Sequence, residues 1–365
     1  PGSQGFADAN QNTKGSSINI TQRFPNNPFT ISATMNVNQR SKDSTISLTL
    51  PDITITMSRI YPFKRKNKVG KDRWYEKISM SYNGYLRNSI DTKENLLFKS
   101  SLVKDWKNAM QHQIPVSATF SLFKYLNLSP SVNYTERWYT RKVMQDYDPA
   151  TRSVVRDTIS GFNRVYNYNM SIQLNTKLYG FFKPWKMFGD KVQMIRHVFT
   201  PSVSFSYAPD FGTSRYGYYE TYTYTDDKGE VRTVEYSPYQ GMAFGVPGKG
   251  MQKSFNFSID NNLEMKVKSD KDTTGVRKIS LIDQLSANMS YNAAAKTRPW
   301  SDLSMNLRLK LSKSYTFNMN ASFATYAYQY DERGNIVVGD RTEWSYGRFG
   351  RFQGYSGSFS YTFNN

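Results

Sequence analysis

The chain has 365 residues, no cysteine, two histidines and a formal net charge of +19 at neutral pH. The lack of cysteine excludes disulfides, thiol nucleophiles and cysteine-based zinc or iron sites within these residues. No apolar run approaches the roughly 18 residues that a membrane-spanning helix needs, which excludes a helical membrane protein. The mean hydropathy of -0.65 still permits a membrane β-barrel, because only every second strand residue of a barrel faces lipid.

The excess of basic residues indicates an anionic partner, and nucleic acid, phosphorylated lipid and acidic glycan all fit a charge of +19. Charge alone does not distinguish these partners. The sequence starts at Pro1, with neither an initiator Met nor the basic and apolar regions of a signal peptide. We therefore expect a processed chain or a segment of a larger protein.

Period-two alternation of apolar and polar residues begins in the segment 29–38, where every second residue is apolar. A tilted strand of this length spans a bilayer. The same alternation recurs in the segments 114–122, 168–174 and 255–267. This repetition predicts a series of long amphipathic strands.

Turn residues and prolines interrupt the strands at two informative places. Within 45–61, Pro51 and Asp52 shift the alternation by one residue, which predicts a β-bulge inside one strand or, alternatively, a two-residue hairpin. The sequence from Asp226 to Glu230 is typical of a turn that closes a Tyr-rich hairpin.

The clearest hairpin joins the alternating segments 303–311 and 315–323, and the last strand, 355–363, alternates aromatic residues and glycine with Ser and Thr. Alternating strands of ten or more residues are about twice the usual soluble length, which favours a membrane barrel over a soluble sandwich or solenoid. The predicted fold class is therefore all-β, an antiparallel transmembrane β-barrel with about fourteen strands in this chain.

Connection lengths supply a second test, because outer-membrane barrels have short periplasmic turns and longer outer loops. Counting strands back from the C-terminus places the turns 123–125 and 312–314 on one side. The long segments 145–158, 208–250 and 331–354 fall on the other side. The loop after Tyr61 contains the basic residues from Lys64 to Arg73 and is called the basic loop. The same count predicts that it is an outer loop.

Two groups of basic residues are candidate binding residues. The basic loop carries the densest charge cluster and is predicted to contact phosphates of a glycolipid, with a solvated loop of no specific role as the alternative. The alternation phase points a second group, Arg308 and Lys310, into the lumen. The candidate phosphate contacts are Lys64, Arg65, Lys66, Lys68, Lys71 and Arg73.

His112 and His197 are the two candidate catalytic bases. No nucleophile elbow accompanies either histidine, so we expect no enzyme activity, and no metal or cofactor site is predicted.

Four segments resemble the LptD family of lipopolysaccharide-assembly barrels. They are Ser58–Phe63, Arg73–Lys77, Arg196–Pro201 and Gly339–Gly350. The resemblance implies an outer-membrane translocon that inserts lipopolysaccharide into the outer leaflet through a seam between first and last barrel strands. It also implies that the anionic partner is lipopolysaccharide and outer-membrane lipid, and not nucleic acid.

Carried over by position, the resemblance assigns the last strand to one side of this lateral seam. The chain, 1–365, would be the C-terminal part of a larger barrel, with a periplasmic β-jellyroll and the first barrel strands upstream of Pro1. Implied partners are an LptE-type lipoprotein plug and the periplasmic Lpt bridge; the absence of cysteine leaves open how assembly is controlled. The seam residues are Gly354, Tyr355, Ser356, Gly357, Ser358, Phe359, Ser360 and Tyr361.

Two other functions compete with lipopolysaccharide export. A passive porin or nutrient-uptake barrel predicts solute conductance without a lipoprotein plug. A surface adhesin or soluble β-structure predicts release from membranes by salt or carbonate washing.

Overall fold

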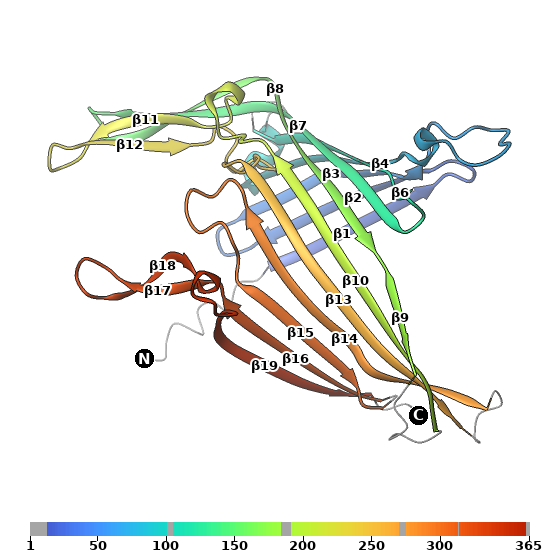
Figure 1. Ribbon diagram of the computed structural model, residues 1–365. Coiled ribbons are helices and arrows are strands. Elements are labelled where there is room, and N and C mark those ends of the chain that lie inside the picture. Colours follow the sequence, from blue (N-terminus) through green and yellow to red (C-terminus); the bar gives the residue numbers. More distant parts are fainter. Residues whose placement is uncertain (1–12, 101–104, 184–190, 270–274, 313, 363–365) are drawn as a thin grey trace. The chain divides into compact units, whose positions relative to one another are not determined.

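The structure is a computed structural model that describes residues 13–100, 105–183, 191–269, 275–312 and 314–362 (Figure 1). Strands dominate it, and most of them belong to one antiparallel sheet of 15 strands. The hydrogen-bonded order begins at β1 and ends at β19, so these two strands are the terminal strands of an open sheet. The architecture confirms the predicted all-β class and agrees with a β-barrel sheet.

The main sheet follows chain order along its path. Its strands are β1 (Thr13–Arg23), β2 (Phe29–Arg40), β3 (Thr45–Ile60), β4 (Ser79–Lys93), β5 (Lys107–Ser117), β6 (Phe120–Leu122), β7 (Leu126–Asp148), β8 (Ser153–Thr176), β9 (Leu178–Phe182), β10 (Val192–Ala208), β13 (Gln252–Lys268), β14 (Val276–Asn292), β15 (Leu303–Lys310), β16 (Tyr315–Ala324) and β19 (Arg351–Tyr361).

Two separate hairpins lie in long connections of the main sheet, one between β10 and β13 and one between β16 and β19. They are β11 (Glu220–Thr225) with β12 (Val231–Tyr236), and β17 (Tyr326–Tyr330) with β18 (Ile336–Thr342). The first is the predicted Tyr-rich hairpin. Short 3-10 helices lie at Trp74–Lys77, Glu94–Lys99, Ser214–Tyr216 and Glu343–Tyr346.

The chain forms two compact units, and strands β7 and β8 contribute residues to both. The first unit contains 1–118, 131–170 and 208–251. The second contains 119–130, 171–207 and 252–365.

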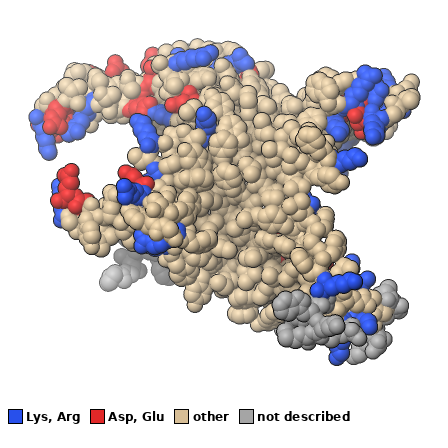
Figure 2. Space-filling view, in the orientation of Figure 1, with Lys and Arg blue, Asp and Glu red and all other residues tan. Residues whose placement is uncertain are grey.

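The strands β15 and β16 each have one polar and one apolar face, as the alternation predicts. In the β15–β16 pair, Leu307 lies opposite Met319 on one face, whereas Asn306 lies opposite Asn320 on the other. Many apolar side chains on these strands are exposed, among them Phe257 and Ile259 of β13. Figure 2 shows few charged atoms over β10, β13 and β14. Exposed apolar faces of this kind suit contact with lipid.

The predicted bulge at Pro51 is confirmed. β3 is one strand, and its register with β2 passes from Thr34↔Asp52 to Asn36↔Thr49. The extra residue in β3 is what shifts the alternation, so Ile53 and Leu48 keep to the same apolar face.

A second bulge lies in the last strand. The register of β16 with β19 passes from Ser322↔Gly354 to Phe323↔Phe352, which leaves Gln353 as the extra residue. Gly354 has a φ of +144°, and the bulge brings Phe352 onto the same face as Tyr355.

The prediction that the basic loop lies on the side of the long segments is wrong. Ser79 follows the loop directly and pairs with Ser117, the last residue of β5. The β7 residue opposite Ser117 is Ser131, and β7 runs from there toward the opposite edge of its unit, where it meets the segment 208–251. The sequence count put the loop and the β5–β7 connection on opposite sides, but two strands, β4 and β5, separate them, so both lie on the same side.

Substitution of Gly354 tests whether the bulge needs a residue of unusual backbone freedom. An L-residue at this φ is strained, so we expect G354A to lower the free energy of unfolding in detergent micelles by about 1–2 kcal/mol. G357A is the matched control: the φ of Gly357 is ordinary, and an added Cβ would meet Phe317 at an ordinary 3.7 Å. G357A should be neutral or stabilising by about 0.5 kcal/mol. Equal losses in urea titrations of the two variants would contradict the strain argument.

Candidate functional site

A groove with both polar and apolar lining runs beside the terminal strand β19. It has a volume of about 500 Å³, and its lining comes from β14, β15, β16 and β19. The cross-strand register explains the lining, because Asn306, Asn320 and Ser356 lie side by side on three successive strands. A parallel row contains Ser304, Ser322 and Gly354.

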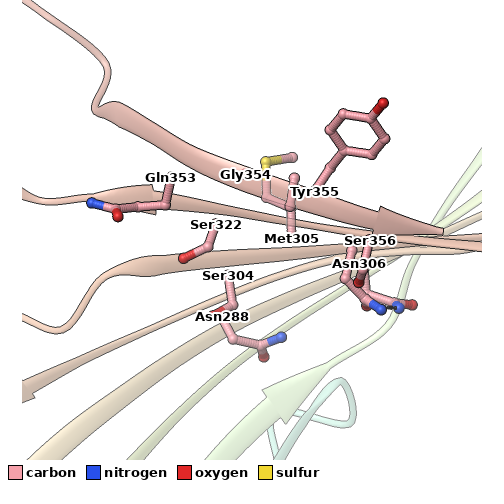
Figure 3. A pocket seen from close by; sticks show the side chains of 11 residues that line it. Asn288, Ser304, Met305, Asn306, Ser322, Gln353, Gly354, Tyr355 and Ser356 are labelled. Atoms are coloured by element: carbon pink, nitrogen blue, oxygen red, sulfur yellow. Dashed lines mark hydrogen bonds between the residues drawn. The ribbon is translucent and has the colours of Figure 1, made fainter.

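The groove offers hydrogen bonds without charge. Its polar side chains are those of Asn, Gln and Ser, and Met305 and Ala321 add apolar surface. Figure 3 shows Asn288, Asn306 and Ser356 on the side of the strands opposite to Tyr355. Such a surface suits a hydroxyl-rich ligand.

The structure places the predicted seam residues along β19 but gives only some of them to the groove. Gly354, Tyr355 and Ser356 line it. The other five, from Gly357 to Tyr361, continue the strand beyond it. The aromatic side chains Tyr355, Phe359 and Tyr361 are exposed, and these three residues share the apolar face with Phe317 of β16.

The two predicted lumen charges share one counter-ion. Arg308 Nε lies 2.5 Å from Asp283 Oδ2, and Lys310 Nζ lies 3.2 Å from Asp283 Oδ1. Arg308 lies on the face of Asn306 and Gln284, as the alternation predicts. Asp283 therefore offsets one of the two positive charges.

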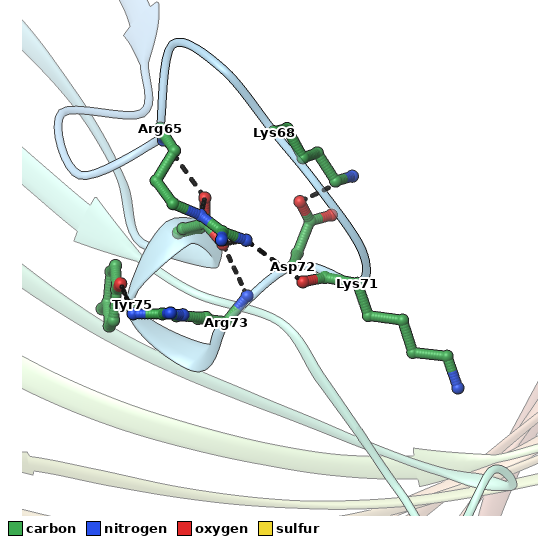
Figure 4. Close-up of polar contacts among 7 residues, drawn as sticks. Arg65, Lys68, Lys71, Asp72, Arg73 and Tyr75 are labelled. Carbon is green, nitrogen blue, oxygen red and sulfur yellow. Dashed lines mark hydrogen bonds and ion pairs between the residues drawn. The ribbon is translucent and has the colours of Figure 1, made fainter.

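The basic loop folds around Glu76, whose side chain is fully buried. Arg65 donates from Nε to Oε1 at 2.8 Å and from Nη2 to Oε2 at 2.9 Å. The backbone N–H groups of Arg65 and Arg73 donate to the same carboxylate at 3.1 and 2.6 Å. Arg65 is thus a structural residue of the loop and not a free phosphate contact (Figure 4).

The remaining basic residues of the loop differ in how far they are engaged. Lys68 pairs with Asp72 at 2.8 Å, and Arg73 Nη1 donates to the Tyr75 hydroxyl at 3.0 Å. Lys66 and Lys71 have no ion pair or side-chain hydrogen bond with any described residue. Glu76, Arg65 and the backbone N–H of Arg73 together are called the Glu76 cluster. In Figure 4 the Lys71 side chain extends away from this cluster. Figure 2 shows blue atoms gathered over the loop.

An inserted segment, residues 237–247, covers the polar face of the first unit. Tyr139 donates its hydroxyl to the Gly245 carbonyl at 2.6 Å, and Arg137 Nε donates to the Phe244 carbonyl at 3.1 Å. The rings of Tyr139 and Tyr239 stack at 5.4 Å. The buried cluster of this unit therefore forms on a face that the sequence predicts to be wet.

A neighbouring tyrosine closes the strand ladder where β8 extends past β10. The Tyr218 hydroxyl accepts from the Tyr166 N–H at 2.8 Å and donates to the Tyr166 carbonyl at 2.9 Å. Both backbone groups are thus satisfied without a partner strand. Sequence reasoning missed this role, because it treated the tyrosines of this segment only as part of the Tyr-rich hairpin.

The two histidines lie in polar pairs without a nucleophile. His112 Nδ1 lies 2.8 Å from the Tyr82 hydroxyl, and His197 Nε2 lies 2.9 Å from Asn261 Oδ1. Within the described ranges, no three His, Asp or Glu side chains gather in a metal-ligand arrangement. The described residues also contain no helix with the length and apolar character that crossing a membrane requires.

Long antiparallel strands with one polar face and one exposed apolar face define the class of outer-membrane-type β-barrel proteins. The sequence model of one protein family, described as LptD protein, matches residues 2–326. The chain belongs to the LptD family. Membership confirms the predicted resemblance and classifies the chain as an outer-membrane β-barrel related to lipopolysaccharide transport, in a transport and assembly family.

Comparisons with individual proteins add little to the family match. No curated protein matches the sequence. Eight chains of solved structures match, among them the siderophore receptor PiuA from Acinetobacter baumannii, at 8% identity and a TM-score of 0.28. That match covers 91% of this chain and 51% of the receptor chain, so the chain spans about half of the receptor's length.

The contacts of Glu76 predict an unusually acidic carboxyl group. Hydrogen bonds from the Arg65 side chain, and then from the Arg73 backbone, lower the pKa of Glu76 from 4.5 to about 2. Because the pKa is lowered on folding, the ionised carboxylate stabilises the loop fully above pH 4.5, and this contribution is lost as the pH falls through 2. We expect R65Q to return the pKa of Glu76 toward 4.5.

Carbon-13 NMR of glutamate-labelled protein in micelles measures this pKa, with E76Q identifying the resonance. K68Q is the matched control, because Lys68 pairs with Asp72 and does not contact Glu76. A titration midpoint near 4.5 in the unsubstituted protein would show that the Glu76 cluster does not form.

Proposed function

We propose that this chain is part of an outer-membrane translocon that inserts lipopolysaccharide into the outer leaflet, with β19 forming one side of a lateral seam. The observation that carries the proposal is the groove beside a terminal strand of the sheet, which combines uncharged Asn, Gln and Ser side chains with apolar surface. Family membership supplies the substrate class.

The two faces of β19 match the two parts of an amphiphilic glycolipid. The groove side presents hydroxyl and amide groups that exchange hydrogen bonds with sugars. The opposite face presents exposed aromatic side chains, which suit acyl chains. A glycolipid leaving between strands would keep its sugars on the first face and its acyl chains on the second.

The terminal strand is also built for weak closure. Gly354 and Gly357 carry no side chain with which to pack against a strand on the far side of the seam. Weak packing at a strand junction lowers the free energy needed to separate it.

The translocon needs partners that this chain does not supply. We propose two partners, an LptE-type lipoprotein plug and a periplasmic Lpt bridge, because the chain belongs to the LptD family. An inner-membrane transporter would provide the energy, so the barrel itself requires no catalytic residue. The membrane that surrounds it would be the cell outer membrane.

Photo-crosslinking along β19 tests the seam. A photoreactive residue at Ser356 or Ser358, introduced in the full-length protein in cells, should capture lipopolysaccharide, because both positions lie on the groove side of the terminal strand. Lys228, in the turn between β11 and β12, is the matched exposed control and should capture none. Immunoblots for crosslinked lipopolysaccharide give the result, and equal capture at Ser356 and Lys228 would refute the seam.

The inserted segment argues against the porin alternative. It covers polar side chains that would otherwise line a water-filled lumen, and its contacts come from four strands, β4, β5, β7 and β8. Arg87, for example, lies 5.7 Å from the Phe244 ring. A segment seated on this face narrows the lumen that a passive pore would use.

Conductance separates the two functions. The double variant R137Q/Y139F removes two hydrogen bonds to the inserted segment, which should weaken its attachment by about 3 kcal/mol and raise the detached population about 100-fold. In planar bilayers we expect low conductance from the unsubstituted protein and frequent openings from the variant. Y134F, on the opposite face of β7, is the control. Steady porin-like conductance that the variant leaves unchanged would favour the porin.

A further inference from the structure

The basic loop, residues 61–78, begins where the apolar face of its strands ends. The register of β3 with β4 closes at Ile60↔Met80, and Met57↔Tyr82 lies next on the same face. Because Ile60 is the last residue before the loop, the loop starts at the level where lipid chains give way to headgroups.

The loop exposes large apolar side chains beside its lysines. The exposed fractions are 56% for Phe63, 84% for Val69 and 68% for Trp74. Seven basic and two acidic residues give the loop a net charge of +5. Aromatic rings with lysines are the combination that proteins place at a membrane surface.

The Glu76 cluster fixes this surface in advance. Arg65 joins the two ends of the loop, since it contacts Glu76 and also donates from Nη2 to the Lys71 carbonyl at 3.3 Å. Lys66 and Lys71 project from a loop that is held in shape. Cations on a preorganised loop lose less entropy on binding an anion than cations on a flexible loop do.

The edge on which the loop lies identifies its lipid. The long segment 208–251 lies at the opposite edge of the same unit. Outer-membrane barrels carry their long loops outside, so the basic loop faces the periplasm. The periplasmic leaflet of an outer membrane consists of phospholipid, whereas lipopolysaccharide occupies the outer leaflet.

We propose that the basic loop is a binding site for anionic phospholipid headgroups of the periplasmic leaflet, with Lys66 and Lys71 contacting the phosphate and Phe63, Val69 and Trp74 inserted between headgroups. The predicted phosphate chemistry of the loop is kept, but its source is phospholipid and not surface glycolipid. The site would hold the barrel at a fixed depth at the point where it meets the periplasm.

Native mass spectrometry of the purified protein in detergent tests the proposal. Titration with dioleoylphosphatidylglycerol should yield bound lipid, and K66Q/K71Q should weaken the apparent affinity about 20-fold, because each lysine near a phosphate layer contributes to binding. Dioleoylphosphatidylcholine should bind equally weakly to both proteins. K228Q/K296Q removes the same charge at exposed positions outside the loop and should retain binding.

Two outcomes would overturn the proposal. Equal phosphatidylglycerol affinity of K66Q/K71Q and the unsubstituted protein would exclude the loop as the site. A loss confined to purified lipopolysaccharide, with phosphatidylglycerol unaffected, would assign the loop to the glycolipid instead. Neither result bears on crosslinking at β19, so this site and the seam can fail independently.

Discussion

The structure depends on the requirement that every backbone N–H and C=O inside a bilayer finds a partner within the protein. Long antiparallel strands meet it, and their period of two then gives each strand one face for lipid and one for a polar interior. Where the ladder ends, another group must substitute, as the Tyr218 hydroxyl does for both backbone groups of Tyr166. The same requirement makes a terminal strand such as β19 the place where a seam is physically reasonable.

Charged side chains, like backbone groups, find partners within the protein. Asp283 receives both Arg308 and Lys310 on the polar face of the second unit, and Glu76 receives Arg65 inside the basic loop. Pairing of this kind lowers the cost of holding charge away from bulk water. The formal charge of +19 therefore overstates what an anionic ligand meets, and a few uncompensated lysines such as Lys66 and Lys71 carry more information than the total.

The strands were predictable because their alternation is local. β2, β13, β15 and β16 follow directly from it, and Pro51 marks its own bulge by a shift of phase. The Glu76 cluster was not predictable, since nothing in the sequence tells which of six basic residues turns inward. The side of the loop was predicted wrongly because it depends on the number of strands that follow it, and β4 and β5 were not separated correctly in the count.

The inserted segment shows that alternation alone does not predict which side chains are buried. Arg137 and Tyr139 occur at polar-face positions, and alternation alone assigns them to water. Their partners, Phe244 and Gly245, are more than a hundred residues away, at separations of 107 and 106. A polar face can become a buried one when a distant connection supplies carbonyl groups for its donors, and tyrosine and arginine are suited to this because their long side chains combine apolar area with a terminal donor. Polar alternation in a barrel strand thus predicts a face that needs hydrogen-bond partners, and those partners are either water or the protein's own loops.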